Sequence, residues 1–288
     1  MLFPSSFLNR SINIIYQSEV EEIQKLLTRC PALLEIDDIR GISSVELGQL
    51  VRDSEERRKF YQAIATAAGK AGDKIVLYRA NRLFERTPLM LSESDSVMER
   101  LSQLPADYLE ITYPILSSDK FLRLRAFQHH QNTSTFTHSL EVSLRAYQMA
   151  KKKGLDCRAA AIGGLLHDYY LYDWHFCDLK WGGDGGVGFF ELHFFTHGFT
   201  AAENAARDFP ELVGSDCNDK VRNIISSHIP FGHLAPHRHR VEKTALSKEA
   251  HIVRRCDMIS SLDIIKNPLK NIGIDSSSLL DKSNHSNQ

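Results

Sequence analysis

Apolar residues recur along most of this chain at the spacing of an α-helix. Ile23 and Leu27 are one helical turn apart near the start, and Ala159, Ile162 and Leu166 repeat the pattern beyond the middle. Each such stretch forms an apolar stripe, which must pack against another stripe to leave water. The strict alternation of apolar and polar residues that marks a half-buried strand is scarce. The sequence therefore predicts an all-α protein built as a helical bundle.

The composition is that of an ordinary globular chain. The 288 residues are 42% hydrophobic and 25% charged, which argues against a disordered chain. The 35 Lys and Arg against 36 Asp and Glu give a net charge of -1, so the overall basic footprint of a nucleic-acid binder is missing. The longest apolar or glycine run, residues 159–166, is far shorter than the ~20 residues of a membrane span.

Targeting and redox signals are also missing from the sequence. Residues 1–16 lack the pattern of a secretory signal, and the five cysteines form neither a CxxC pair nor the pattern of a disulfide framework. We therefore expect a cytoplasmic protein without a membrane helix. The sequence leaves its oligomeric state open.

Prolines and short polar residues gather between residues 88 and 118, which indicates a connecting region. We predict an accessory helical region over 1–118, a catalytic domain over 119–270 and a flexible tail over 271–288. Within the first part, residues 43–68 have the form of two short helices about a turn, with Asp53 and Glu56 spaced as in a capping box. This segment fits either a helical packing module or a helix-turn-helix DNA reader, and the latter lacks a recognisable recognition helix.

Histidine is distributed unevenly along the chain. All 13 histidines lie at or beyond His129, so imidazole chemistry is expected only in the second, catalytic part. Four of them and two aspartates fall on or beside separate predicted helices. The six residues are His138, His167, Asp168, His197, His228 and Asp257. Such nitrogen and oxygen donors, converging in a helical bundle, suit hard or borderline divalent metals.

The adjacent pair His167-Asp168 is the most informative part of this set. It ends the apolar helix predicted over residues 159–166. Two neighbouring side chains can aim at one point there because the helix terminates. A carboxylate has two oxygens, so Asp168 can touch two ions while His167 serves one of them.

The remaining members of the set are placed by their own helices. His197 is expected just before a helix over residues 200–208, and His228 at the end of one over 221–227. Asp257 is expected within an apolar helix, where an unpaired charge would be costly and a cation would offset it.

Five segments carry a resemblance to the HD-domain superfamily of metal-dependent phosphohydrolases, whose signature is a His, a His-Asp pair and a distant Asp on separate helices. The segments are NTSTFTHSLEV, LLHDYYLYDWH, THGFTAAENA, IISSHIPF and IVRRCDMISS. They resemble in particular a bacterial group of HD-domain hydrolases, and the likeness covers about residues 125–262. Where that group has Gln-His-Gly, this chain has His129-His130-Gln131. His130 thereby matches the group's histidine and becomes a candidate substrate contact.

The resemblance implies the HD fold and a binuclear metal centre. The first ion would be bound by His138, His167, Asp168 and Asp257, and the second by His197 and His228 with Asp168 bridging. The metal identity stays open among Fe, Mn, Zn, Co and Ni. Two such ions can hold a hydroxide between them and stabilise charge in the transition state of phosphate transfer, which gives Asp168 a catalytic role.

Further candidates lie in two polar segments. His175 and His193 flank a glycine-rich stretch over residues 182–188, which we interpret as a flap over the metal site. Either histidine can be a catalytic proton donor or substrate contact, or alternatively an ordinary surface histidine. Arg238 and Arg240 are candidates for binding a substrate phosphate, the alternative being a solvated basic loop.

The leading hypothesis is a binuclear phosphohydrolase acting on a phosphomonoester or phosphodiester of a nucleotide or small metabolite. An HD-type di-iron oxygenase uses the same order of ligands and stays an alternative. A third possibility is a non-catalytic HD-fold sensor or scaffold with structural ions. The ligand set alone does not separate these three.

Overall fold

The computed structural model describes residues 3–30, 33, 36, 39–130, 133–177, 193–216, 219–229 and 246–266. In these segments helices dominate, and the one sheet is a two-stranded antiparallel hairpin. The predicted all-α class is confirmed. No helix in the described segments is both long and apolar enough to cross a bilayer.

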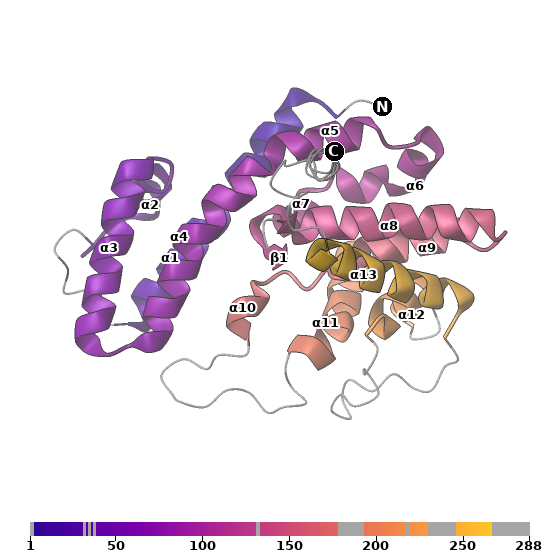
Figure 1. Ribbon diagram of the computed structural model, residues 1–288. Helices are drawn as coiled ribbons and strands as arrows, with labels where there is room; N and C mark the ends of the chain where they lie inside the picture. The colour runs from indigo at the N-terminus through magenta and orange to yellow at the C-terminus, as the bar shows by residue number, and fades with distance from the viewer. Residues whose placement is uncertain are drawn as a thin grey trace, which may run out of the picture.

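Four helices at the start of the chain form an elongated lobe, at the left of Figure 1. They are α1 (Ser5–Arg29), α2 (Ser44–Leu50), α3 (Ser54–Ala71) and α4 (Lys74–Ser92). Asp53 caps α3 through the backbone N–H groups of its first turn, as the sequence indicated. The complete reciprocal capping box lies one helix earlier, between Ser43 and Glu46.

The following helices build the histidine-bearing part of the molecule. A connecting set comprises α5 (Ser94–Ser102), α6 (Ala106–Leu116), α7 (Asp119–Leu122) and the 3-10 helix η2 (Arg123–Ala126). The hairpin of β1 (Gln128–His130) and β2 (Thr133–Ser134) comes next. The remaining helices are α8 (Thr135–Lys152), α9 (Cys157–Leu166), α10 (Trp174–Cys177), α11 (His193–Asp208), α12 (Lys220–Ser227) and α13 (Lys248–Lys266).

The apolar side chains of the described segments form two main cores. One fills the α1–α4 lobe, and Phe176 of α10 belongs to it. The other surrounds α8 and α9, and it includes Phe7 of α1, Val97 of α5 and Tyr108 of α6. Residues 94–118, which the sequence assigned to the accessory region, therefore share a core with the metal-binding helices. The predicted tail over 271–288 lies outside the described residues.

α8 and α9 approach each other closely, and this contact positions the site. A Cβ on Gly164 would lie 2.9 Å from the Cα of Ser143, so only glycine allows the two backbones this separation. The hydroxyl of Ser143 also donates a hydrogen bond to the carbonyl of Ala161 at 2.6 Å and accepts a hydrogen bond from the hydroxyl of Tyr108 at 2.7 Å. These contacts fix the end of α9 beside the first turns of α8.

α11 begins earlier than the sequence indicated. His197 was expected to precede a helix over residues 200–208, but it lies inside α11, which starts at His193. Gly198 lowers the helical propensity of this stretch, which hides the helix in the sequence. In the fold a Cβ at Gly198 would meet Ile229 Cδ1 at 2.9 Å, so the glycine serves close packing.

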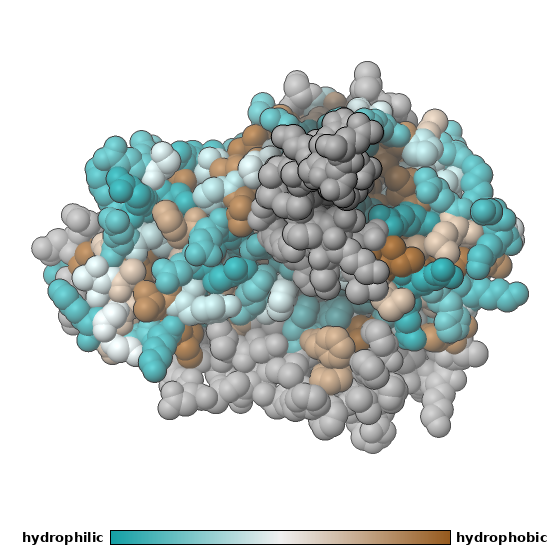
Figure 2. All heavy atoms as spheres, in the orientation of Figure 1, coloured by the Kyte–Doolittle hydropathy of each residue, from teal (hydrophilic) through white to brown (hydrophobic). Residues whose placement is uncertain are grey.

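The surface agrees with this division into cores. Hydrophilic residues cover most of the α1–α4 lobe in the view of Figure 2, with hydrophobic ones scattered. Among the described residues the large hydrophobic side chains that stay exposed are Val45, Tyr78, Phe194 and Met258. The last two lie together at the site described next.

Candidate metal centre

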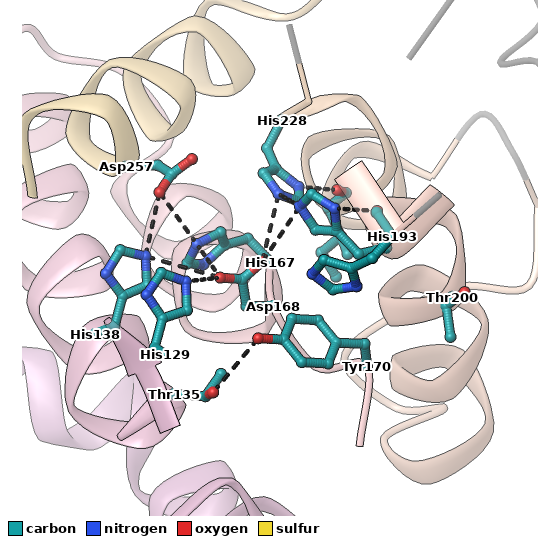
Figure 3. Close-up of polar contacts among 12 residues, drawn as sticks. His129, Thr135, His138, His167, Asp168, Tyr170, His193, Thr200, His228 and Asp257 are labelled. Atoms are coloured by element: carbon teal, nitrogen blue, oxygen red, sulfur yellow. Dashed lines mark hydrogen bonds and ion pairs between the residues drawn. The ribbon is translucent and has the colours of Figure 1, made fainter. Parts of the chain in front are cut away.

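The six predicted residues are brought together from five helices or their ends. Figure 3 labels His138, His167, Asp168, His228 and Asp257 among them. His138 lies in the first turns of α8, which begins after Ser134 caps the backbone N–H of Thr137. His167 is the C-cap residue of α9, and Asp168 follows it. The others are His197 in α11, His228 at the C-cap of α12 and Asp257 within α13.

The histidines at helix ends are oriented by their own helices. The Nδ1 atoms of His167, His197 and His228 pair with backbone carbonyls of the same helix at 2.8, 2.8 and 2.7 Å. A carbonyl only accepts, so each Nδ1 carries the proton in these pairs. Backbone partners of this kind set the tautomer of metal-binding histidines and leave Nε2 for the ion.

One oxygen of Asp168 faces a first group of imidazoles. Asp168 Oδ2 lies 2.9 Å from Nε2 of His129, 3.3 Å from that of His167 and 3.8 Å from that of His138. Asp257 Oδ1 completes the group at 3.1 Å from His138 Nε2 and 3.7 Å from His167 Nε2. We call these five residues the first donor group.

The other oxygen of Asp168 faces a second group. Asp168 Oδ1 lies 3.6 Å from His197 Nε2 and 3.5 Å from His228 Nε2. The two Nε2 atoms are 2.9 Å apart. We call these three residues the second donor group, and Asp168 belongs to both.

Both groups fit a bound cation. Metal–nitrogen and metal–oxygen bonds of about 2.0–2.2 Å allow two ligands of one ion to lie at most about 4.4 Å apart, and all the distances above fall within that limit. His167 is fully buried, yet its Nε2 makes no hydrogen bond to any described residue. A buried imidazole nitrogen that lies between two carboxylates and has no hydrogen-bond partner matches the position of a metal ligand. Nitrogen and oxygen donors without sulfur favour Fe, Mn, Co, Ni or Zn.

The aspartates and histidines of the centre shift each other's pKa values. Burial alone would raise the pKa of Asp168, but the neighbouring His167 and His129 hold it well below its usual range. Burial alone would raise the pKa of Asp257, but the hydrogen bond from His138 and the charge of His167 hold it well below its usual range. Burial and the neighbouring His138 lower the pKa of His129 to about 4. Burial and the neighbouring His228 lower the pKa of His197 to about 4. Near neutral pH the centre therefore offers two carboxylates and, at His129 and His197, neutral imidazoles. Burial alone would lower the pKa of His167, but Asp168 and Asp257 raise it well above its usual range, so a bound cation would replace a proton on this ring.

A cleft of about 380 Å³ opens over these donors. Its walls are largely aromatic and apolar, and the residues beyond the donor groups are Tyr170, Trp174, His193, Phe194, Ile229, Met258 and Ser261. Between Tyr170 and Tyr172 the chain turns at Leu171, whose φ of 62° is uncommon for a branched residue. Such backbone strain is frequent at functional sites.

The two histidines predicted to flank the flap occupy different places. His193 lines the cleft, where Nδ1 lies 3.0 Å from the hydroxyl of Tyr172 and the ring lies nearly parallel to that of His197 at 4.6 Å. His175 is not among the residues described as lining the cleft. The Nδ1 atom of His175 lies 2.8 Å from Oδ1 of Asp173, and the other carboxylate oxygen of Asp173 pairs with Arg86. The described surroundings therefore favour His193 as the residue that meets a substrate.

The sequence missed His129. Matching the group's Gln-His-Gly to His129-His130-Gln131 selected His130, but β1 is irregular: Gln128 pairs with Ser134 and His130 pairs with Thr133, so one extra residue lies on β1. This bulge turns His129 into the centre. With one residue inserted in the hairpin, the dipeptide Gln128-His129 matches the Gln-His of the group's motif, and this match could have identified His129.

Several other predicted residues lie outside what the structure describes. The side chain of His130, the glycine-rich stretch 182–188 and both Arg238 and Arg240 belong to this set. Their roles stay predictions.

Comparison with known proteins identifies one family. Residues 135–262 match the family model of the HD domain, a span that runs from the first turn of α8 into α13. It contains all six predicted ligands and begins just after His129. No curated protein and no solved structure matches the chain.

Proposed function

We propose that this chain, whose residues 135–262 match the family model of the HD domain, is a phosphohydrolase of the HD-domain superfamily with two divalent metal ions. The substrate would be a phosphomonoester or phosphodiester of a nucleotide or small metabolite. The observation that carries the proposal is the position of Asp168, whose two oxygens face different histidine groups. With ions bound, Asp168 would contribute one ligand oxygen to each donor group.

The bound ions would supply the hydrolytic chemistry by lowering the pKa of water and neutralising phosphate charge. The protein's own residues prepare the site for that work. The backbone carbonyls that hold Nδ1 of His167, His197 and His228 keep Nε2 directed at the ions. His138 and His167 are fully buried, which removes these two rings from solvent and strengthens their electrostatic interactions with the carboxylates.

The bound ions would be the first partners of the substrate phosphate. They would neutralise the phosphoryl oxygens, together with Arg238 and Arg240 if the sequence prediction for these two residues holds. The aromatic wall of Tyr170, Trp174 and Phe194 then leaves room for an uncharged, flat part of the substrate. His193, within the same wall, is placed to contact the substrate, and because burial and the neighbouring His197 lower its pKa to about 2, it would do so as a neutral imidazole that accepts a proton.

The test is hydrolysis by metal-loaded protein. Wild type would be freed of metal, reloaded separately with Mn²⁺, Fe²⁺, Co²⁺, Ni²⁺ or Zn²⁺, and assayed on p-nitrophenyl phosphate, bis-p-nitrophenyl phosphate and nucleotides. We expect two ions per chain and turnover with at least one metal. His197→Gln should retain about one ion and lose about 100-fold or more in rate, within the several kcal/mol that a second ion contributes. His251→Gln, an exposed histidine of α13, is the matched control and should behave as wild type.

Two outcomes would overturn the proposal. One is wild type that binds two ions with every metal and hydrolyses no phosphoester. The other is one ion per chain together with full activity of His197→Gln. An iron-loaded protein that absorbs visible light and consumes dioxygen, without hydrolysis, would instead support the oxygenase alternative.

A further inference from the structure

We propose that His129 is a fifth protein ligand of the ion held by His138, His167, Asp168 and Asp257. This inference rests on the proposed function only for the presence of a metal at the first donor group. His129 lies outside the matched HD-domain span and reaches the centre from the β1–β2 hairpin.

The backbone of His129 is fixed on both sides. The bulge between Gln128 and His130 gives its side chain a direction that regular pairing would not. The carbonyl of His129 accepts the indole N–H of Trp174 at 3.2 Å. The neighbouring Gln128 side chain accepts from Arg82 of α4 at 2.7 Å. The imidazole therefore approaches the donors from a defined position.

The imidazole ring of His129 is arranged like that of His138, a member of the first donor group. It lies parallel to the ring of His138, with centroids 3.8 Å apart and planes 10° from each other. Its Nε2 is 2.9 Å from Asp168 Oδ2, closer than the Nε2 of either His138 or His167. The side chain is buried, with 9% exposed. An imidazole placed this way is directed at the same point as the four signature ligands (Figure 3).

The consequence is an unequal pair of sites. With His129, the first donor group supplies five protein ligands, close to the six of an octahedral ion. The second group supplies three, namely His197, His228 and one oxygen of Asp168. The second ion therefore keeps the open positions for water and substrate, beside His193 and Phe194 in the cleft wall. The first ion should be the more tightly bound.

The experiment counts metal-bound imidazoles in the wild-type protein. Protein labelled with ¹⁵N-histidine would be titrated with Zn²⁺ and followed by NMR of the ring nitrogens. We expect five Nε2 signals to move to metal-bound positions, and His129→Gln should remove one of them. Four moving signals, all retained in His129→Gln, would overturn the proposal whether or not the variant is stable.

Metal affinity gives a second readout. Competition with a chelator should show that His129→Gln weakens the tighter Mn²⁺ site by more than the 10–100-fold typical of a lost outer partner. His251→Gln should leave both affinities unchanged, and the melting temperature of metal-free protein controls for folding. Unchanged Mn²⁺ affinity in His129→Gln contradicts ligation. Five metal-bound imidazoles in a protein that hydrolyses no phosphoester would contradict the proposed function but still support ligation by His129.

Discussion

At the scale of single residues, the two aspartates of the centre differ in how many histidine groups they face. Asp168 directs one oxygen to each group, whereas Asp257 contacts only His138 and His167. A neutral amide is a weaker ligand than a carboxylate and cannot offset the charge of two ions. Asp168→Asn should therefore lose both ions, and Asp257→Asn should lose mainly the first.

The measurement is elemental analysis of each variant after dialysis against dilute metal. We expect roughly two ions for wild type, one for Asp257→Asn and fewer than one for Asp168→Asn, following the linkage of ligand charge to affinity. Asp208→Asn is the control, since its carboxylate pairs with Tyr169 and Arg207 away from the centre. Two ions retained by Asp168→Asn would contradict the bridging role.

The sequence could predict the candidate ligands because each lies in or directly beside a helix with an apolar stripe. It could not predict His129, because a one-residue bulge in a short hairpin has no periodicity to reveal it. His175 looked equivalent to His193, since both flank the glycine-rich stretch. Their difference depends on Asp173, whose pairing with Arg86 across 87 positions is a tertiary contact.

At the scale of elements, the crossing of α8 and α9 decides the spacing of the first donor group. A methyl group on Gly164 would press on the backbone of Ser143 rather than on a flexible side chain. Such overpacking costs about 1–3 kcal/mol. Because His138 and Asp168 belong to the two elements that would separate, Gly164→Ala should also weaken metal binding.

Gly69 provides the contrasting position. It lies within α3, and nothing would stand within 4 Å of a Cβ there. Gly69→Ala should therefore stabilise the protein by about 0.5–1 kcal/mol through helix propensity. Urea denaturation of the metal-free proteins measures both effects. Equal stability changes for the two substitutions would refute the close-approach argument.

The limits of helix prediction follow the same physics. The start of α8 was predictable because Ser134 is a favoured N-cap residue. The start of α11 was not, because Gly198 and a nearby glycine-rich stretch favour an interpretation as a loop. Packing against Ile229 overrides that local preference.

At the scale of the whole molecule, the accessory helices and the HD domain share apolar core. Tyr108, Ile115 and Leu116 are fully buried against α8 and α9, and Phe7 of α1 joins them. A fragment starting at residue 119 would expose this surface to water. At about 25 cal/mol per Å² of apolar area, the loss of several such side chains is comparable to the whole stability of a typical domain.

We therefore expect the fragment 119–288 to be insoluble or to lack fixed tertiary packing. Near-UV circular dichroism and thermal unfolding measure this, with the full chain as control. A cooperative transition with a native near-UV spectrum would show instead that the domain boundary near residue 118 suffices for folding.

The two cores are also joined by a buried ion pair, Arg86 of α4 with Asp173, at 2.9 Å. Burial would raise the pKa of Asp173, but the hydrogen bond from His175 and the charge of Arg86 lower it to about 2. A carboxyl with a lowered pKa contributes stability above its unfolded pKa of about 4, and that contribution is lost as pH falls through about 2. The full contribution is about 2 kcal/mol, of which about half is lost by pH 3.

The prediction concerns the difference between wild type and Asp173→Asn, because other carboxylates titrate in both proteins. Above pH 5 wild type should be more stable by a constant amount, and its advantage should shrink by about 1 kcal/mol between pH 5 and pH 3. Urea denaturation at several pH values, on metal-free protein, measures this. Parallel stability profiles for the two proteins would mean that the Arg86–Asp173 pair does not depend on the carboxylate charge. The α1–α4 lobe would then be joined to the HD domain by apolar packing at Phe176 and Phe7 and by hydrogen bonds such as that from Arg82 to Gln128.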